Sequence, residues 1–283
     1  MYKFPIGIII DGLKVDRKTA IETAAQMGVD GIQMFATKGV NAPENMDASA
    51  RKALKKEIAD AGLVFSSLCG DLGMGFGDRE RNPVLIAKLK KILDLAYDLG
   101  TDIVTAHIGV VPEDTNHERF KIMQEACAEL CNYAEKNGSY FAIETGPEKS
   151  TTLLNFIESL GSKGVAINFD PANLRMVLDE DPIVAVKNLA KYIVHTHAKD
   201  GVMLTKGNPE FIYRVVHPIP PEVKQMKFFE ERPLGEGAVN FPEYLKALEE
   251  VGYKGFLVVE REAGLDPKQN IGLAVEYLKN AIK

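Results

Sequence analysis

The stretch NGSYFAIE, residues 137–144, contains the unit from which this chain is built. A helical pattern ends at Asn137, and Gly138 can adopt the left-handed conformation that commonly terminates a helix. A short apolar run then predicts a buried strand, and Glu144 closes that run with a carboxylate. The same order of helix, glycine, apolar run and polar residue recurs along the sequence and predicts a repeated strand–helix fold.

Apolar runs alternate with amphipathic segments from one end of the chain to the other. We expect strands near residues 6–10, 31–34, 64–68, 103–107, 140–144, 165–170, 192–197 and 256–260. Helical patterns cover residues 17–27, 48–61, 82–99, 119–137, 151–160, 182–189, 242–251 and 266–281. Strands that alternate with helices form parallel sheets, and eight such units close most simply into a (β/α)8 TIM barrel. The sequence therefore predicts an α/β fold in which residues 1–283 form one barrel domain.

Composition narrows the class of protein. The chain has 34 Lys and Arg residues and 40 Asp and Glu residues, so its net charge is -6. This acidic balance disfavours a nucleic-acid partner. The first residues show no secretory signal, and no apolar run approaches the ~20 residues that span a bilayer. Cys69, Cys127 and Cys131 form no paired motif and suit a reducing compartment. We expect a soluble cytoplasmic protein that acts on a small molecule, without a membrane partner.

Potential metal ligands close four of the predicted strands: Glu144, Asp170, His197 and Glu260. A single carboxylate at a strand end is most often an ordinary solvated residue. In a (β/α)8 barrel, however, active sites lie at the carboxyl ends of the strands, and these four residues would come from adjacent strands of one rim. Two Glu, one Asp and one His can bind a divalent cation and still provide carboxylates for proton transfer. The pattern predicts a metal site at this rim.

Other polar residues lie near the same predicted rim. His195 precedes His197 by two residues, so both face one side of their strand, and His195 is expected either to support the site or to contact substrate. His107 closes the fourth strand and is expected to contact substrate or to hydrogen-bond a ligand carboxylate. An ordinary hydrogen-bonded histidine is the alternative for His107. Lys199 and Arg261 are candidates for binding a phosphate or carboxylate, unless they are simply solvated.

Two segments break the regular alternation. Residues 201–240 form an unusually long connection after the seventh strand, with five prolines and several aromatic residues. Such a length is typical of a lid over the site or an oligomer contact, and a surface excursion packed by its own aromatics is the alternative. Residues 69–77 are rich in glycine but lack the Lys-Ser/Thr ending of a phosphate loop, so we interpret them as a mobile substrate loop.

Five ordered motifs resemble the xylose isomerase-like TIM-barrel superfamily, and its sugar isomerase and 3-epimerase branch most closely. They are IET at residues 143–145, NFDPAN at 168–173, HTHAKD at 195–200, PLGEG at 233–237 and VVE at 258–260. The resemblance covers essentially the whole chain. It implies an isomerase or epimerase of a sugar or sugar phosphate that depends on one divalent cation, often manganese, with magnesium, cobalt and zinc as other candidates.

The resemblance also assigns roles to individual residues. It implies that Glu144, Asp170, His197 and Glu260 bind the cation. In the ketose 3-epimerases of this superfamily the first and last of these carboxylates also exchange protons with the substrate, which makes Glu144 and Glu260 the catalytic pair. The chemistry of the residues agrees, because a proton beside a carbonyl leaves when a metal stabilises the enediolate and a nearby carboxylate accepts the proton.

Three positions depart from the epimerase pattern. Asn173 stands where the epimerases carry a substrate-contacting His, and Met203 lies near the position of their Arg. Gln33 ends the second strand where relatives often have Glu, so it can bind hydroxyls but cannot act as a base. We therefore expect contacts to the substrate that differ from those in the epimerases. The expected substrate-binding set consists of Gln33, His107, Asn173, His195 and Lys199.

Other activities are compatible with parts of this pattern. A dehydratase of an inositol- or shikimate-like keto substrate starts with the same proton abstraction and then expels a hydroxyl group. Apurinic-site endonucleases share the superfamily but need further His and Asp ligands for three zinc ions, which Asn173 and residues 201–240 do not supply. A non-catalytic sugar-binding barrel is disfavoured because the four ligands and the acid/base pair are present. The sequence leaves open which sugar is bound and whether the chain forms a homo-oligomer.

Overall fold

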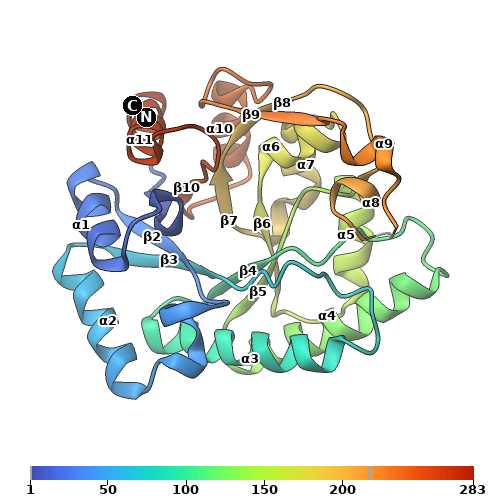
Figure 1. Cartoon of the computed structure of the whole chain (residues 1–283), viewed down its shortest axis with the longest axis horizontal. Coiled ribbons are helices and arrows are strands. Elements are labelled where there is room, and N and C mark those ends of the chain that lie inside the picture. The colour runs from blue at the N-terminus through green and yellow to red at the C-terminus, as the bar shows by residue number, and fades with distance from the viewer. Residues whose placement is uncertain (1, 216–217) are drawn as a thin grey trace.

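Eight parallel strands close into a barrel in the computed structural model, which describes residues 2–215 and 218–283 (Figure 1). The barrel strands are β1 (Ile6–Ile9), β2 (Gly31–Phe35), β3 (Val64–Cys69), β4 (Ile103–Ala106), β5 (Tyr140–Glu144), β6 (Val165–Phe169), β7 (Ile193–Ala198) and β10 (Leu257–Val259). Their order around the barrel follows the chain, and β10 pairs with both β7 and β1 to close it. The predicted (β/α)8 TIM barrel is confirmed.

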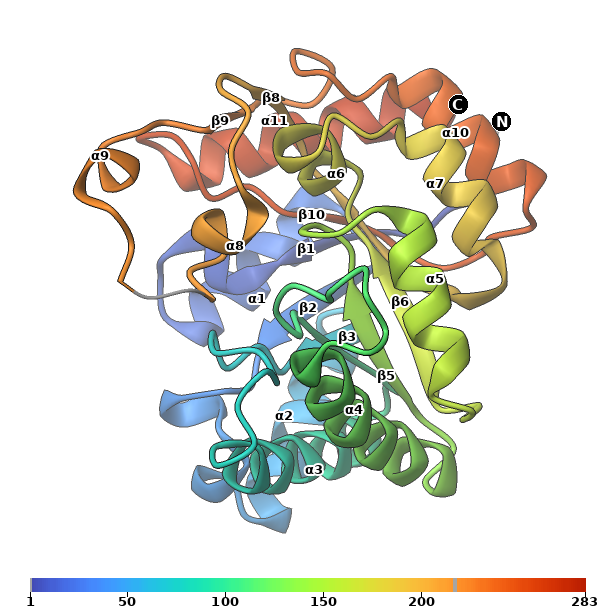
Figure 2. The same ribbon diagram turned by 90° about the vertical axis from the view of Figure 1, so that its right-hand side faces the viewer.

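Helices cover the outside of the barrel (Figure 2). They are α1 (Arg17–Met27), α2 (Ala48–Asp60), α3 (Asn82–Leu99), α4 (Glu118–Lys136), α5 (Ser150–Ser159), α7 (Pro182–Leu189), α10 (Phe241–Glu250) and α11 (Pro267–Ala281). Gly100, Gly138, Gly161 and Gly252, which follow helix ends, have φ values between 62° and 91°, so the expected left-handed conformation is confirmed. Within the described residues, no helix is long and apolar enough to cross a membrane.

The hydrophobic core lies between the barrel and its helices. Phe141 on β5, Phe156 on α5 and Tyr244 on α10 are among its largest fully buried side chains. Each barrel strand, and each of the eight helices named above, begins and ends within one residue of its predicted range. The apolar periodicity of the sequence therefore corresponds to burial against the barrel. It predicts where each strand ends, and thus which side chains lie at the rim.

Two features were not anticipated from the sequence. A short helix, α6 (Pro171–Val177), begins directly after β6. Residues 201–240 are also more regular than the expected long loop. The antiparallel strands β8 (Asp200–Met203) and β9 (Phe229–Arg232) form a ribbon whose connection carries α8 (Pro209–Ile212) and α9 (Pro221–Lys224). The connection after β7 is thus a folded excursion that extends from the barrel toward the α4 side (Figure 1).

The base of this excursion is fixed by Asp200. Its carboxylate accepts hydrogen bonds from the backbone N–H groups of Gly201, Gly235, Gly237 and Val239, at 2.8–3.0 Å. One side chain therefore ties the first residues of the excursion to the chain that returns to α10. Because a carboxylate with several backbone donors makes strong charge-assisted bonds, the two ends are held together firmly.

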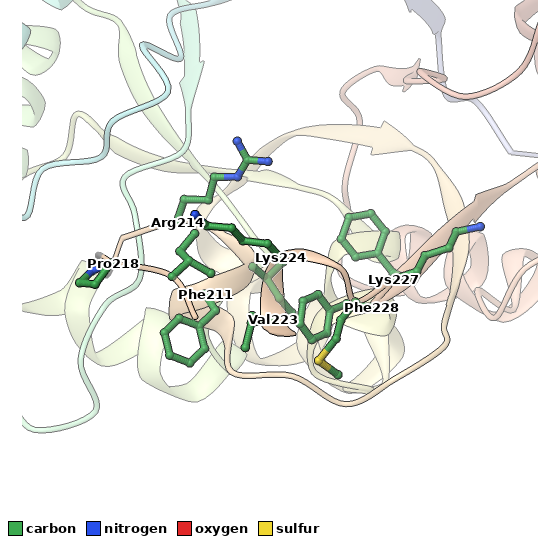
Figure 3. A pocket seen from close by; sticks show the side chains of 11 residues that line it. Phe211, Arg214, Pro218, Val223, Lys224, Lys227 and Phe228 are labelled. Atoms are coloured by element: carbon green, nitrogen blue, oxygen red, sulfur yellow. The ribbon is translucent and has the colours of Figure 1, made fainter. Parts of the chain in front are cut away.

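A cavity of about 1000 Å³ lies within the excursion itself (Figure 3). Its lining combines apolar side chains, including Phe211, Val223 and Phe228, with the basic residues Arg214 and Lys224. Among the described residues, this lining shares none with the four predicted metal ligands. The cavity is therefore separate from the predicted site.

Candidate metal and catalytic site

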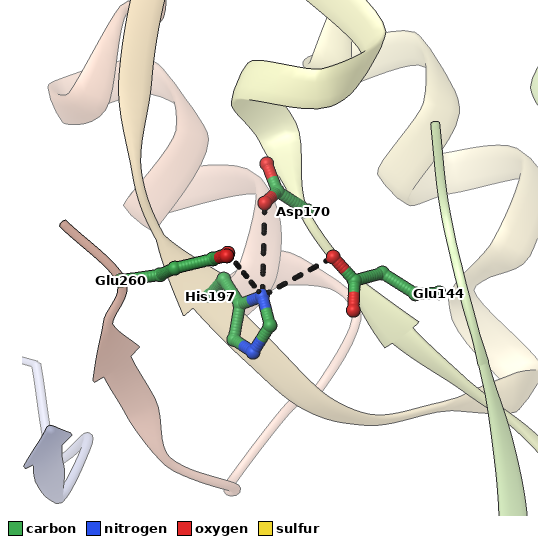
Figure 4. A group of neighbouring side chains, drawn as sticks. All are labelled: Glu144, Asp170, His197 and Glu260. Carbon is green, nitrogen blue, oxygen red and sulfur yellow. Dashed lines mark ion pairs between the residues drawn. The ribbon is translucent and has the colours of Figure 1, made fainter. Parts of the chain in front are cut away.

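Four side chains converge where β5, β6, β7 and β10 end: Glu144, Asp170, His197 and Glu260 (Figure 4). These strands are consecutive in the barrel, so their carboxyl ends place the four residues next to one another. One nitrogen or carboxylate oxygen from each residue lies within 4.8 Å of those from the other three. The structure thus brings together the whole set of ligands that the sequence suggested.

The atoms of this cluster are arranged around His197 Nδ1. It lies 2.8 Å from Oε2 of Glu260, 3.5 Å from Oε1 of Glu144 and 3.6 Å from Oδ2 of Asp170. Even so, His197 Nδ1, Asp170 Oδ2 and Glu260 Oε2 are buried without a hydrogen-bond partner in the described part of the chain. Buried polar atoms without partners are costly, and one imidazole with three carboxylates is a suitable donor set for a divalent cation. The residues present therefore fit one metal ion.

The two carboxylate oxygens of Asp170 have different roles: one caps α6, and the other belongs to the cluster. Oδ1 accepts hydrogen bonds from the backbone N–H groups of Ala172 and Asn173, at 2.8 and 2.9 Å, and caps α6. Pro171 at the first helical position favours the same helix start. The hydroxyl of Thr145 accepts a hydrogen bond from the Asp170 N–H at 2.8 Å. These contacts fix Asp170 so that Oδ2 faces His197.

His197 is oriented from behind by Gln33. Nε2 of His197 donates to Oε1 of Gln33 at 2.9 Å, and the Gln33 amide nitrogen donates to the Thr105 hydroxyl at 3.0 Å. This chain places the proton of a neutral His197 on Nε2 and leaves the Nδ1 lone pair facing the carboxylates. Gln33 is 1% exposed. Both of its polar atoms are used inside the barrel, and the contact with substrate hydroxyls expected for Gln33 stays a prediction.

A layer of buried polar residues lies beneath the cluster. Asn168 donates from Nδ2 to Oε2 of Glu144 at 3.1 Å, and its Oδ1 accepts from Nδ1 of His195 at 2.8 Å. Nε2 of His195 lies 3.2 Å from the hydroxyls of both Ser66 and Ser67. Burial holds the pKa of His195 well below its usual value, and the charge of His197 acts in the same direction. Of the two roles expected for His195, support of the site fits this buried position, and substrate contact does not.

Glu144 has two further partners, His107 and Asn173. Its Oε1 lies 3.3 Å from Nε2 of His107 and accepts a hydrogen bond from Nδ2 of Asn173 at 3.2 Å. The His107 side chain is 26% exposed, so it also reaches open space beside the cluster. The hydrogen bond to a ligand carboxylate that we expected for His107 is therefore geometrically available, and Asn173 makes a similar contact.

Lys199 brings a buried positive charge to the other side of the cluster. Its Nζ lies 3.2 Å from Oε1 of Glu260 and 3.8 Å from Oδ2 of Asp170. Burial disfavours the charge, but Glu260, Asp170 and Glu144 outweigh burial and raise the pKa of Lys199 well above its usual value. Lys199 is therefore a fixed ammonium group whose nearest partners are the carboxylates of the cluster.

The carboxylates of the cluster differ in their tendency to ionise. Burial raises the pKa of Asp170 above its usual value. Burial also opposes ionisation of Glu144, but His107 and His197 outweigh it and lower the pKa of Glu144. For Glu260, Lys199 and His197 outweigh burial and hold its pKa well below the usual range. The two glutamates are thus ionised at neutral pH.

His197 compensates for this negative charge when no cation does. Burial opposes protonation of its ring, but Glu260 and Glu144 outweigh burial and raise the pKa of His197 well above its usual value. A cation at the same point would take over that electrostatic role and release the proton from Nδ1. The cluster therefore favours a positive charge at this point, whether a protonated His197 or a bound cation provides it.

Sequence reasoning did not assign roles to several residues around the cluster. Asn168 is a polar residue inside an otherwise apolar strand, which was the available signal for a role inside the barrel. Thr105 and Ser67 carried a similar but weaker signal. Tyr213 carried none, because it comes from the excursion and reaches the site only through the tertiary fold: its ring centre lies 5.4 Å from that of His107.

The profile of the xylose isomerase-like TIM barrel family matches residues 21–281, so this chain belongs to that family. A curated relative, an uncharacterised protein of Methanocaldococcus jannaschii, is 23% identical over 228 residues, which cover 77% of this chain and 70% of the relative.

Solved structures with the same fold cover nearly the whole chain. A xylose isomerase domain protein from Planctomyces limnophilus superposes with a TM-score of 0.80 at 27% identity, covering 99% of this chain and 96% of that one. A D-tagatose 3-epimerase-like protein has a TM-score of 0.73 at 19% identity, with 98% of each chain covered. The probable 3-DHS dehydratase involved in petrobactin synthesis from Bacillus anthracis has a TM-score of 0.73 at 16% identity, covering 98% and 99%.

Proposed function

We propose that this protein is a divalent-metal-dependent isomerase or epimerase of a sugar or sugar phosphate. The observation that carries the proposal is the buried cluster at the barrel rim, where three carboxylates converge on His197 and the atoms His197 Nδ1, Asp170 Oδ2 and Glu260 Oε2 have no hydrogen-bond partner in the described part of the chain. The D-tagatose 3-epimerase-like neighbour supports a sugar as the substrate. Manganese, magnesium, cobalt or zinc can each accept this donor set.

Glu144 and Glu260 are the proposed acid and base. Both pKa values are lowered, and the two carboxylates lie on either side of His197 (Figure 4). One carboxylate removes the proton from the carbon beside the substrate carbonyl. The other, after taking up a proton from water, delivers it to the opposite face, which inverts that carbon, and the first carboxylate returns its proton to water. Delivery to the neighbouring carbon instead gives isomerisation. When bound, the cation supplies Lewis-acid polarisation of the carbonyl oxygen.

The surrounding residues keep this pair in position. His107 and Asn173 hold Oε1 of Glu144, and Lys199 holds Oε1 of Glu260. Asp170 and His197 serve as ligands in this proposal. Each is fixed by contacts outside the cluster, to the α6 backbone and to Gln33.

A dehydratase is the second candidate. The probable 3-DHS dehydratase shares the fold over nearly the full length of both chains. Its class of reaction begins with the same removal of a proton beside a carbonyl, so the Glu144–Glu260 pair serves either outcome. An apurinic-site endonuclease gains no support, because among residues 2–215 and 218–283 one cluster of this kind is found, whereas three zinc ions need further ligands.

Deuterium exchange tests the proposed chemistry. The Mn²⁺-loaded protein is incubated in D₂O with a panel of ketoses and keto-polyols, and products are analysed by NMR. We expect deuterium at the carbon beside the carbonyl, whereas loss of water with a new conjugated absorbance indicates the dehydratase. Glu144→Gln and Glu260→Gln should each lower the rate by about 10²–10⁴-fold. Glu180→Gln, which changes a carboxylate that binds Ser150 at the start of α5, is the matched control. Unchanged rates in both cluster variants would show that the acid/base assignment is wrong.

A further inference from the structure

Tyr213 lies at the cluster although it belongs to the excursion after β7. It directly follows α8, and its backbone N–H donates to the carbonyl of Pro209 at 2.8 Å. Its ring meets the ring of His107 edge-on, with centroids 5.4 Å apart and an interplanar angle of 69°. Burial, together with the charges of Glu144 and Asp170, raises the pKa of Tyr213 well above its usual value, so its hydroxyl keeps its proton. The excursion thus delivers a phenol group to the open side of the site.

Gly146 makes room for this phenol. A Cβ at Gly146 would lie 2.3 Å from the Tyr213 hydroxyl oxygen and 3.2 Å from Cβ of Asn173. Gly146 does not have a positive φ, so the backbone conformation does not require glycine here. Space for the Tyr213 hydroxyl is therefore the physical reason for a glycine two residues after Glu144.

Tyr213 is held in place by contacts on both sides of α8. Glu210, in the same short helix, forms an ion pair with Arg119 of α4. Asp200 fixes the base of the excursion, and Arg261 donates to Glu231 of β9 at 2.6 Å. These three contacts link the excursion to α4, to its own returning chain and to the segment after β10. The excursion that carries Tyr213 is therefore anchored at three points.

The charges around Tyr213 indicate what it can bind. The ionisable groups that influence it most are Glu144, Asp170 and Glu148, which are acidic, and Lys199, whose nearest partners are cluster carboxylates. The one arginine on α4, Arg119, is paired with Glu210, and Arg214, next to Tyr213, lines the separate cavity within the excursion. A phosphate at this end of the pocket would meet net negative charge, whereas a hydroxyl can accept a hydrogen bond from the neutral phenol.

We propose that Tyr213 is a specificity-determining residue that binds a hydroxyl at an uncharged end of the substrate, on the side of the cluster where His107 and Asn173 contact Glu144. This inference rests on the proposed function and adds to it the substrate class, an unphosphorylated ketose or related polyol at that end. It also gives the excursion a defined role, since Tyr213 belongs to it.

Ligand binding tests this proposal without turnover. Binding of D-ribulose, D-xylulose, D-fructose and D-tagatose, and of their terminal phosphates, is measured by saturation-transfer NMR on the Mn²⁺-loaded protein. We expect at least one free sugar to bind more tightly than its phosphate. Tyr213→Phe should weaken that binding about tenfold while the affinity for Mn²⁺ stays unchanged. Gly146→Ala should weaken it similarly by displacing the phenol, with Tyr213 intact.

Tyr140→Phe is the matched control, because Tyr140 begins β5 at the opposite end of the barrel. Tighter binding of the phosphates, equal binding by wild type and Tyr213→Phe, or no binding by any member of the panel would overturn the proposal. Its failure is distinguishable from failure of the proposed function, since deuterium exchange reports proton transfer and this experiment reports binding. If deuterium exchange occurs but Tyr213→Phe binds the sugars as tightly as wild type, the proposed proton transfer stands and only the role of Tyr213 is refuted.

Discussion

At the scale of single residues, the behaviour of His197 depends on a neighbour that never reaches the pocket. Gln33 accepts the Nε2 hydrogen, and Thr105 in turn fixes Gln33. Gln33 therefore orients His197, although a glutamine cannot act as a base. Its effect is to define which nitrogen of His197 faces the carboxylates.

Replacing Gln33 should weaken metal binding. Gln33→Leu keeps the volume of the side chain but removes the acceptor for His197 Nε2, so we expect affinity for Mn²⁺ to fall about 10–100-fold. Thr105→Val, which leaves Oε1 of Gln33 in place and removes only its support, should have a smaller effect. Isothermal titration calorimetry on metal-free protein measures both. Equal affinity in wild type and Gln33→Leu would mean that Gln33 does not orient His197.

Glu148 gives the fold a pH dependence of its own. It is 5% exposed, and burial raises its pKa to about 8, against an ordinary value of 4.5. Because the folded pKa is raised, its contribution to stability is fully present below pH 4.5 and is lost as pH rises through 8. Glu148→Gln cannot ionise and keeps an acceptor for the N–H of Val111.

We therefore expect wild type and Glu148→Gln to unfold at similar denaturant concentrations at pH 5. At pH 9 the variant should be more stable, by on the order of a few kcal/mol. Urea unfolding across this range measures the difference, and Glu158→Gln, on the exposed face of α5, serves as the control. A difference that does not change with pH would contradict the raised pKa of Glu148.

At the scale of elements, α6 links the fold to the cluster through Asp170. Oδ1 of Asp170 caps the helix and Oδ2 faces His197, so one side chain has a structural and a chemical role. The sequence placed Asp170 at the end of a strand but gave no sign of a helix immediately after it. Only seven residues long, α6 is too short for a clear amphipathic repeat, although Pro171 marked its first turn.

The two roles of Asp170 can be separated by substitution. Asp170→Asn keeps a capping oxygen, so the metal-free variant should be at least as stable as wild type, because a buried carboxylate with a raised pKa is removed. Asp170→Ala should lose about 1 kcal/mol of stability with the cap. Both variants should lose measurable Mn²⁺ binding. Chemical unfolding and calorimetry provide the two measurements, and equal stability of Asn and Ala variants would contradict the capping role.

The excursion after β7 could not be predicted in this form for a physical reason. Its five prolines favour a loop, and the ribbon forms because Asp200 accepts N–H groups from residues as far along the chain as Val239. Such a contact leaves no local pattern in the sequence. The same holds for Tyr213, which reaches His107 across more than a hundred residues of chain.

At the scale of the whole molecule, the barrel and the convergence of the four residues followed from one repeated pattern. Strands that end in Glu144, Asp170, His197 and Glu260 are neighbours once the sheet closes, so their positions in the sequence were sufficient. What was not predictable was how each side chain is held. Some of those contacts come from across the barrel, as with Gln33 on β2, and others from α6, whose backbone holds Asp170.

Binding of Mn²⁺ to the metal-free protein is the decisive measurement for the whole arrangement. Calorimetric titration at pH 7, repeated in buffers of different ionisation enthalpy, gives the number of ions and of protons released. We expect one ion per chain with release of a proton, because the cation displaces the proton that the carboxylates hold on His197. Asp170→Asn should abolish this binding. An absence of binding, several ions per chain, or unchanged binding in Asp170→Asn would contradict a single metal site at the barrel rim.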